Sequence, residues 1–215
     1  MAKAPYILGI VSHKGGTGRT TTALCLAWHL GQAGRKVTLI DADPMRCMSL
    51  LALNAAGSCP WPNVEFRAGG EALAESHQTD LVIVDSPSLL DPLSQQVLDA
   101  ADGIILTSLA DPLSIRTVPA AAAIIGKARE RNPRLELLGL LAGIYNARDE
   151  VQRAVLGRLQ DGHRELLLSP VIPFQSEMRE WAMKAGVQPP EGAASAAFAT
   201  LSRNLVDSLL ARKSG

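Results

Sequence analysis

One loop of ten residues constrains the fold of this chain more than any other stretch. Ser12–Thr21 reads SHKGGTGRTT, and it lies between an apolar run at Tyr6–Val11 and a helix-like run at 21–30. The apolar run has the residues of a buried strand. A strand, a glycine-rich loop and a helix in this order are typical of a phosphate-binding loop, in which glycines let backbone N–H groups converge on an anion. The positive end of the helix dipole strengthens that attraction.

The loop departs from the usual pattern G-x-x-x-x-G-K-[ST] at two places. His13 stands where the first glycine is expected, and Arg19 stands where a lysine reaches the β- and γ-phosphates. Thr20 has the hydroxyl that reaches Mg²⁺ in such loops. Lys14, at the start, is the only lysine of the loop. A glycine-rich turn without a ligand is the alternative, and the agreement of strand, loop, threonine and helix weighs against it.

Acidic residues follow two further predicted strands. Asp41 and Asp43 come directly after the apolar run at 36–40, and Asp85 ends the run that begins at Asp80. The carboxyl ends of parallel strands share one edge of a sheet, where ligands bind. We therefore expect these acids to lie beside the phosphate loop and to act on a metal and a water molecule. Taken singly, each is also explained as a turn residue.

Three motifs together resemble those of a known family. Lys14–Thr20 closely resembles the deviant Walker A loop, K-G-G-x-G-K-[ST], of the ParA/MinD family of dimerising ATPases. Asp41–Pro44 resembles its Walker A′ motif, although Met45 stands where the family usually has glutamine, and Asp80–Asp85 resembles its Walker B strand. The layout is most similar to the small ParA proteins of plasmid partition. The resemblance implies a P-loop NTPase fold, ATP and ADP as ligands with Mg²⁺, and hydrolysis of ATP.

The resemblance also implies roles for single residues. Lys14 would reach across a homodimer to the partner's phosphates, Asp43 would position the attacking water, and Arg19 would supply catalytic positive charge. ATP would then switch dimerisation on, and its hydrolysis would be the timer. The nucleotide-binding residues implied are Gly15, Gly16, Thr17, Gly18, Arg19, Thr20 and Thr21, with Asn146 and Pro173 at the adenine. Surface caps and turns explain Asn146 and Pro173 about as well. The magnesium residues implied are Thr20, Asp41 and Asp85.

Strands and helices alternate along the rest of the chain. The pattern predicts strands at 64–67, 103–108 and 139–145, and helices at 70–76, 91–101, 114–131, 149–160, 176–185 and 194–212. This alternation predicts an α/β fold with a mostly parallel twisted sheet and helices on both faces. Residues 48–62 show no clear pattern, because Pro60 and Pro62 break regular pairing.

Length and composition set the remaining limits. A chain of 215 residues with 47% hydrophobic residues is enough for one domain over 1–215. Lys and Arg number 21, as do Asp and Glu, so no overall basic field favours nucleic acid. The odd number of cysteines, without C-x-x-C spacing, predicts reduced thiols in the cytoplasm. No run reaches the ~20 apolar residues of a membrane span, and Met1–Pro5 leaves no room for a signal peptide before the first strand.

The partners expected follow from the resemblance. In the family, an ATP dimer binds nucleoid DNA non-specifically and responds to a ParB-like or cargo adaptor protein. The candidate contacts to DNA phosphates are Arg179, Lys184, Arg203, Arg212 and Lys213. A solvated charged face would explain each of them singly.

Two other functions stay open. A MinD-like membrane-associated ATPase would need the stripe of Leu201, Leu205, Leu209 and Leu210 on the last helix to face lipid. Core packing explains this stripe better, and Arg212-Lys213 is a short basic end for an anchor, so a membrane partner is not expected. The second open function is an ATP-sensing interaction module with little or no hydrolysis, because the planar guanidinium of Arg19 is bulkier than a lysine ammonium. On this ground the sequence predicts slow basal turnover and a higher kcat in Arg19→Lys. The alternative is that the loop, including His13 and Met45, has adapted to arginine, in which case Arg19→Lys lowers kcat.

Overall fold

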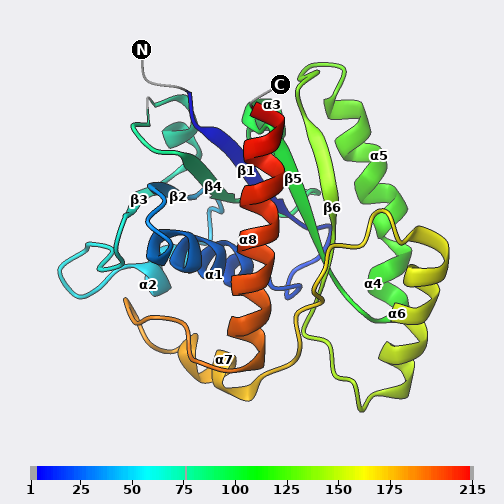
Figure 1. Ribbon diagram of the computed structural model, residues 1–215. Helices are drawn as coiled ribbons and strands as arrows, with labels where there is room; N and C mark the ends of the chain where they lie inside the picture. Colours follow the sequence, from blue (N-terminus) through cyan, green and yellow to red (C-terminus); the bar gives the residue numbers. More distant parts are fainter. Residues whose placement is uncertain (1–3, 76, 214–215) are drawn as a thin grey trace.

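A parallel sheet forms the centre of the computed structural model, which describes residues 4–75 and 77–213, without the side chains of His163 and 210–213 (Figure 1). Its six strands are β1 Tyr6–Val11, β2 Val37–Asp41, β3 Val64–Ala68, β4 Leu81–Asp85, β5 Gly103–Leu109 and β6 Glu136–Gly143. Their order across the sheet is β3-β2-β4-β1-β5-β6, and each neighbouring pair is parallel. All the strand ends with predicted acids therefore lie at one edge.

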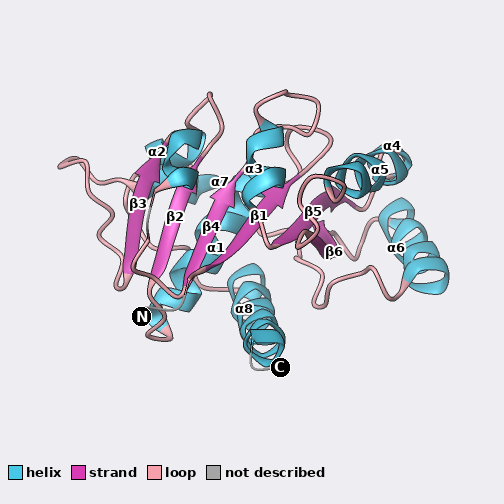
Figure 2. Cartoon of the chain, turned by 90° about the horizontal axis from the view of Figure 1, so that it is seen from above, coloured by secondary structure: helices cyan, strands magenta, loops and turns pink. Residues whose placement is uncertain are grey.

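Helices cover both faces of this sheet (Figure 2). The helices α1 (Arg19–Gln32) and α8 (Ala193–Lys213) lie against one face, and α3 (Ser94–Ala100) and α5 (Val118–Ala128) lie against the other. The other helical segments are α2 Cys47–Ala52, η1 Gly70–Ala74, α4 Pro112–Arg116, α6 Glu150–His163 and α7 Ser176–Trp181. The predicted α/β fold of the P-loop NTPase type is confirmed.

The strands read as apolar runs because both of their faces are buried. In β1, Leu8 and Ile10 pack with α1 and α8, whereas Val11 packs with the helices of the opposite face. Successive residues of a strand point to opposite sides, so a strand covered on both sides needs apolar residues throughout. This is why β1, β2 and β4 could be predicted.

The helix predicted at 114–131 is two helices. α4 ends at Arg116 and α5 begins at Val118, and the Thr117 hydroxyl donates to the Ser114 carbonyl at 2.7 Å. Pro119 lies in the first turn of α5. Proline has no N–H and clashes in a helix interior but fits a first turn, so the helix must restart before it.

The helix α2 lies in the stretch where the sequence showed no pattern. It follows Arg46, whose φ of 51° is left-handed, a conformation that sequence propensity does not predict for arginine. Met48 and Ala52 bury it against the α1 side of the core.

Other boundaries differ from the predictions by a few residues. β6 begins at Glu136, three residues before the predicted strand. α3 begins only at Ser94, because Asp91 accepts the Leu93 N–H in a turn. The helix predicted at 70–76 is the 3-10 segment η1, and residue 76 lies outside the described chain. The helix predicted at 176–185 ends at Trp181.

The apolar stripe on α8 packs into the core. Leu201, Leu205 and Leu209 are only 1%, 7% and 6% exposed and belong to the cluster that includes α1. The side chain of Leu210 lies outside the description. Among the described residues, no helix has the length and apolar content that crossing a bilayer requires.

Candidate nucleotide site

The glycine-rich loop connects the central strand β1 to α1 and borders open space. Gly16 and Gly18 have φ angles of 74° and 87°, which glycine adopts without steric penalty. A Cβ built on Gly15, Gly16 or Gly18 would meet no atom within 4 Å. In the described chain these three N–H groups donate no hydrogen bond, and the first turn of any helix leaves its own N–H groups unpaired. The loop is thus a row of available donors that fits an anion.

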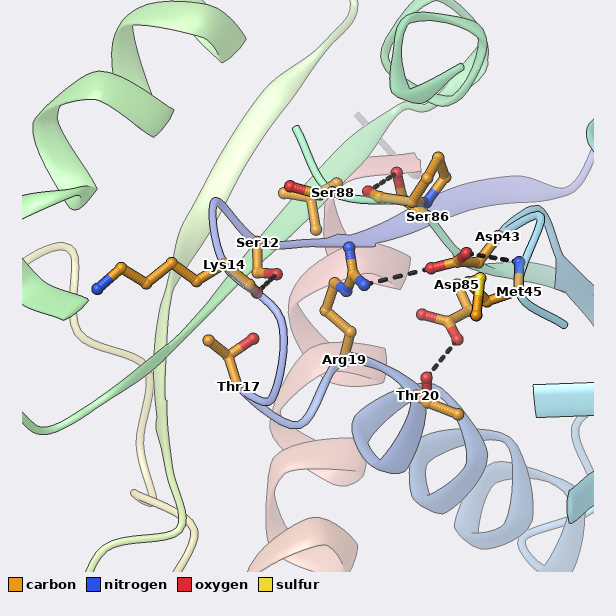
Figure 3. A network of polar contacts seen from close by, with 12 residues as sticks. Ser12, Lys14, Thr17, Arg19, Thr20, Asp43, Met45, Asp85, Ser86 and Ser88 are labelled. Atoms are coloured by element: carbon orange, nitrogen blue, oxygen red, sulfur yellow. Dashed lines mark hydrogen bonds and ion pairs between the residues drawn. The ribbon is translucent and has the colours of Figure 1, made fainter. Parts of the chain in front are cut away.

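Asp85 and Asp41 stand side by side behind this loop. The Thr20 hydroxyl donates to Asp85 Oδ2 at 2.7 Å (Figure 3). Asp41 pairs with Asp85 in the β2–β4 register, and its Oδ2 accepts the N–H and the hydroxyl of Ser49 at 2.8 and 2.6 Å. The remaining Oδ1 atom of each aspartate is buried and has no hydrogen-bond partner among the described residues. Two orphaned carboxylate oxygens beside a threonine hydroxyl fit a hydrated Mg²⁺.

The electrostatics of Asp85 agree with a cation at this place. Burial is the main reason why its pKa is raised to about 7. The hydrogen bond from Thr20 and the charge of Arg19 oppose this rise in the pKa, whereas the charges of Asp41 and Asp43 add to it. A nearby metal ion would favour the charged form.

Protein groups alone do not build a metal centre here. Within the described residues, no three His, Cys, Asp or Glu side chains are grouped closely enough to hold an ion. Mg²⁺ is usually bound through one or two protein ligands, with water and phosphate oxygens completing its shell. The residues present therefore fit a magnesium ion that arrives with a nucleotide.

Arg19 and Asp43 form an ion pair across the site. Arg19 Nη2 donates to Asp43 Oδ2 at 3.3 Å, and the two side chains are only 13% and 17% exposed. The other oxygen, Oδ1, accepts the N–H of Met45 at 3.0 Å (Figure 3). Arg19 Nη1 is buried without a hydrogen-bond partner in the described chain. Two of the three residues that the sequence analysis makes catalytic are thus in direct contact.

Lys14 extends away from the interior of its own loop. In Figure 3 its side chain points in the direction opposite to Arg19 and the acids. Its charge acts on Asp111, the N-cap of α4. Burial opposes a low pKa for Asp111, but hydrogen bonds from Ser114 and Leu113, together with Lys14, hold the pKa below its usual range.

A pocket of about 210 Å³ adjoins the loop. Thr17, Gly18 and Thr21 form its side nearest the loop. Its apolar walls include Leu141, Ile172, Pro173, Phe174, Met178 and Phe198. Arg179 lies over the Phe174 ring at 5.5 Å and also borders the pocket. This pocket beside the phosphate loop fits a mostly apolar ring, and Pro173, a residue predicted at the adenine, is one of its lining residues.

Asn146 does not line this pocket. It is exposed, its side-chain oxygen accepts the Arg148 N–H, and its own N–H donates to Gln152. These contacts form a turn before α6. The structure therefore does not bring Asn146 to the other predicted residues.

Several site residues carry no signal in the sequence. Ser49, which holds Asp41, lies on α2, the helix that the pattern did not predict. Met178 and Phe198 come from α7 and α8, and an isolated bridge between Tyr145 and Pro173 joins the segment just after β6 to the pocket wall. Their apolar character alone predicts only core, so no local pattern distinguishes a pocket wall.

The candidate DNA contacts lie in different environments. Arg179 stacks on Phe174, and Lys184 is exposed after α7. Arg203 is exposed on α8 and donates to the Thr200 hydroxyl. The side chains of residues 212 and 213 lie outside the description.

A glycine loop after the central parallel strand, with acids at the ends of neighbouring strands, defines a P-loop nucleotide-binding protein. The family model described as "CobQ/CobB/MinD/ParA nucleotide binding domain" matches residues 8–186. The chain belongs to this family, as its motifs predicted.

Individual relatives cover nearly the whole chain. The chromosome-partitioning ATPase Soj of Thermus thermophilus is 28% identical over 95% of this chain and 95% of its own. The structure of cobyrinic acid a,c-diamide synthase from Mycobacterium smegmatis, with bound ATP analog and magnesium, has a TM-score of 0.76 at 25% identity and covers 94% of each chain. The cell division ATPase MinD of Pyrococcus furiosus has a TM-score of 0.73 at 22% identity, over 96% of this chain and 99% of its own. These relatives are named for different functions, so the assignment of a function to this chain has to come from its own site.

Proposed function

We propose that this protein is a ParA/MinD-type ATPase that uses ATP-dependent dimerisation as a switch in DNA partition or intracellular cargo positioning. The observation that carries the proposal is the meeting of Thr20, Asp85 and Asp41 behind the open glycine loop, with two carboxylate oxygens that have no partner in the described part of the chain. The similarity to Soj, which is named a chromosome-partitioning ATPase, supports partition as the process.

The chemistry proposed is hydrolysis of ATP to ADP and phosphate. Phosphoryl transfer depends mainly on positioning and on neutralising charge. The N–H groups of Gly15, Gly16 and Gly18 hold phosphate oxygens, and the adjoining pocket takes the adenine. Thr20 and Asp85 hold the magnesium, whose charge neutralises the β- and γ-phosphates, with Asp41 behind them. Asp43 orients the attacking water.

Two features support a homodimer as the ATP-bound state. Lys14 points away from its own loop, so its charge is available to the phosphates of a second copy. Apolar side chains follow three of the strands at the same edge: Met45 is 76% exposed, Leu90 66% and Leu113 65%. Large apolar side chains exposed at the same edge as a charged site favour a docking surface there.

Light scattering with Mg²⁺ and a non-hydrolysable ATP analogue tests this proposal. We expect the mass to double with the analogue and to stay monomeric with ADP. Lys14→Ala should remain a monomer yet bind nucleotide with similar affinity, whereas Lys127→Ala, an exposed lysine of α5, should dimerise normally. An unchanged mass at concentrations well above the nucleotide Kd would contradict the dimer switch.

Non-specific DNA and a ParB-like or cargo adaptor protein are the partners we propose for the dimer, in the cytoplasm at the nucleoid. The burial of Leu201, Leu205 and Leu209 supports DNA over a membrane, because these side chains are not available to lipid. Binding to random DNA that weakens with salt, without binding to anionic vesicles, is the expected result.

One observation favours a second candidate, an ATP-sensing module that hydrolyses little. The guanidinium of Arg19 already engages Asp43, the acid that would orient water. Single-turnover hydrolysis separates the two: the module predicts that bound ATP stays intact, and the ATPase predicts slow conversion to ADP.

A further inference from the structure

The contact between Arg19 and Asp43 goes beyond what the loop motif predicts (Figure 3). We propose that Arg19 is a positioning residue, which holds Asp43 with one guanidinium nitrogen and the terminal phosphate of a nucleoside triphosphate with the other. The inference rests on the proposed function, since it takes Asp43 as the acid that orients water. It adds a link between that acid and the phosphate.

The first half of the link is formed in the structure. Nη2 lies 3.3 Å from Oδ2, and both side chains are largely shielded from water. The Met45 N–H holds the other carboxylate oxygen at 3.0 Å. Asp43 is therefore fixed from two sides, and Arg19 is one of them.

The second half is a donor without an acceptor. Nη1 is buried, and no described residue accepts its hydrogen bonds. Leaving a charged donor unpaired in the interior is costly, so its partner has to be a group that binds there. The adjoining glycine loop borders open space and presents further unpaired donors. The shared chemistry of these donors points to an anion with several oxygens, which is a phosphate group.

Arginine suits this double role better than lysine. The guanidinium fork places two nitrogens at a fixed separation, so each can bind a different acceptor. A lysine ammonium supplies the charge from a single nitrogen on a flexible stem. Arg19→Lys should thus keep nucleotide affinity and lose the placement of Asp43. Of the two outcomes that the sequence left open for Arg19→Lys, this one favours the lower kcat.

The link also reaches an exposed peptide bond. The Arg46 N–H donates to the Asp43 carbonyl at 2.9 Å, and Arg46 is exposed at the end of this turn. Fixing Asp43 through a bound phosphate should therefore steady the turn and slow trypsin cleavage after Arg46. Arg148, which is exposed in the turn before α6, provides an internal reference cleavage.

Limited trypsin digestion in the Lys14→Ala background tests the link, because this background is designed to keep the protein monomeric. With Mg²⁺, we expect the non-hydrolysable ATP analogue to slow cleavage after Arg46 several-fold more than ADP does, with no change at Arg148. Adding Arg19→Lys or Asp43→Asn should each abolish the difference between analogue and ADP. If the Arg19→Lys protein keeps the same difference between analogue and ADP as the Lys14→Ala background, the inference is overturned.

Calorimetry on the same proteins separates this inference from the proposed function. If the wild type binds no nucleotide, the proposed function fails and the inference with it. If Arg19→Lys loses more than about 10-fold in affinity for the analogue, equivalent to 1.4 kcal/mol, the phosphate takes both guanidinium nitrogens, none is left for Asp43, and the inference fails alone.

Single-turnover hydrolysis gives the second readout. A shift of the acid by about 1 Å can cost on the order of 100-fold in rate. Arg19→Lys should lower kcat in the wild type and have little effect when Asp43 is already asparagine, because the two residues act as one unit. A kcat that rises in Arg19→Lys would contradict the proposal.

Discussion

Asp85 shows how a buried carboxylate at a candidate magnesium site affects the folding stability of the nucleotide-free protein. Its pKa of about 7, raised by burial, lies above the value of ~4 in an unfolded chain. The folded protein therefore binds this proton more tightly than the unfolded one, and the stability gained from the proton is lost as pH rises from about 4 to 7.

Asp85→Asn should therefore stabilise the nucleotide-free protein above pH 7. The asparagine can still accept the Thr20 hydrogen bond and carries no charge to bury. We expect a gain on the order of 2–4 kcal/mol at pH 8 and a much smaller one at pH 5. Urea unfolding with EDTA at both pH values measures it, with Asp161→Asn, an exposed acid of α6, as the control. A gain independent of pH would show that charge burial is not the cause.

Single residues also show where sequence reasoning stopped. The loop glycines, Thr20 and Asp85 belong to local patterns whose spacing fixes their chemistry, so they could be predicted. The pairing of Arg19 with Asp43 joins the start of α1 to the turn after β2, 24 residues apart, and no local pattern contains it. It depends on which strand ends the folded sheet brings together.

At the scale of single elements, α1 illustrates a close approach that only glycine permits. A Cβ on Gly31 would lie 2.3 Å from the Pro62 carbonyl oxygen and 2.8 Å from a Val64 methyl group. The backbone of the segment before β3 cannot move without disturbing β3 itself. Gly126 in α5 is the opposite case, since a Cβ there would meet nothing within 4 Å.

Gly31→Ala and Gly126→Ala should therefore change stability in opposite directions. The first overpacks a rigid contact and should cost about 1–3 kcal/mol. The second removes the flexibility of a helical glycine and should gain about 0.5–1 kcal/mol. Urea unfolding of both variants checks this prediction. Similar effects from the two substitutions would mean that helix propensity, and not packing, dominates.

Elements were predicted where their pattern was local. Fully buried strands could be predicted from their apolar runs. Helix α6 could be predicted from its capping residue, because Asp149 accepts the N–H groups of Val151 and Gln152 at its start. α2 could not be predicted, since it depends on a left-handed arginine and on burial of Met48 by distant segments. Contacts with distant segments cannot be predicted from the pattern of neighbouring residues.

At the scale of the whole molecule, the exposed apolar edge predicts how strongly the dimer depends on non-polar contact. Burying one large apolar side chain contributes about 1.5–3 kcal/mol at most. Met45→Ser or Leu113→Ser should therefore weaken analogue-driven dimerisation by about 10-fold or more, with monomer nucleotide affinity nearly unchanged.

Sedimentation of the analogue complexes over a range of concentrations measures this effect. Met183→Ser is the matched control, because Met183 is 81% exposed but lies between α7 and α8, not after a strand. A loss of dimer in the control equal to that in the edge variants would place the interface elsewhere.

The position of β1 in the middle of the sheet has a consequence during synthesis. Its hydrogen-bonded neighbours are β4 and β5, so β1 cannot pair until these later strands are synthesised. Tyr6 pairs with Leu81, and Leu8 pairs with Gly103. At about 5–20 residues per second, a ribosome needs on the order of 4–15 s to make the 75 residues that separate Tyr6 from Leu81. During that time an apolar strand with open edges leaves the exit tunnel without a partner. The strand that carries the phosphate loop is therefore the segment of the nascent chain that most needs protection from aggregation.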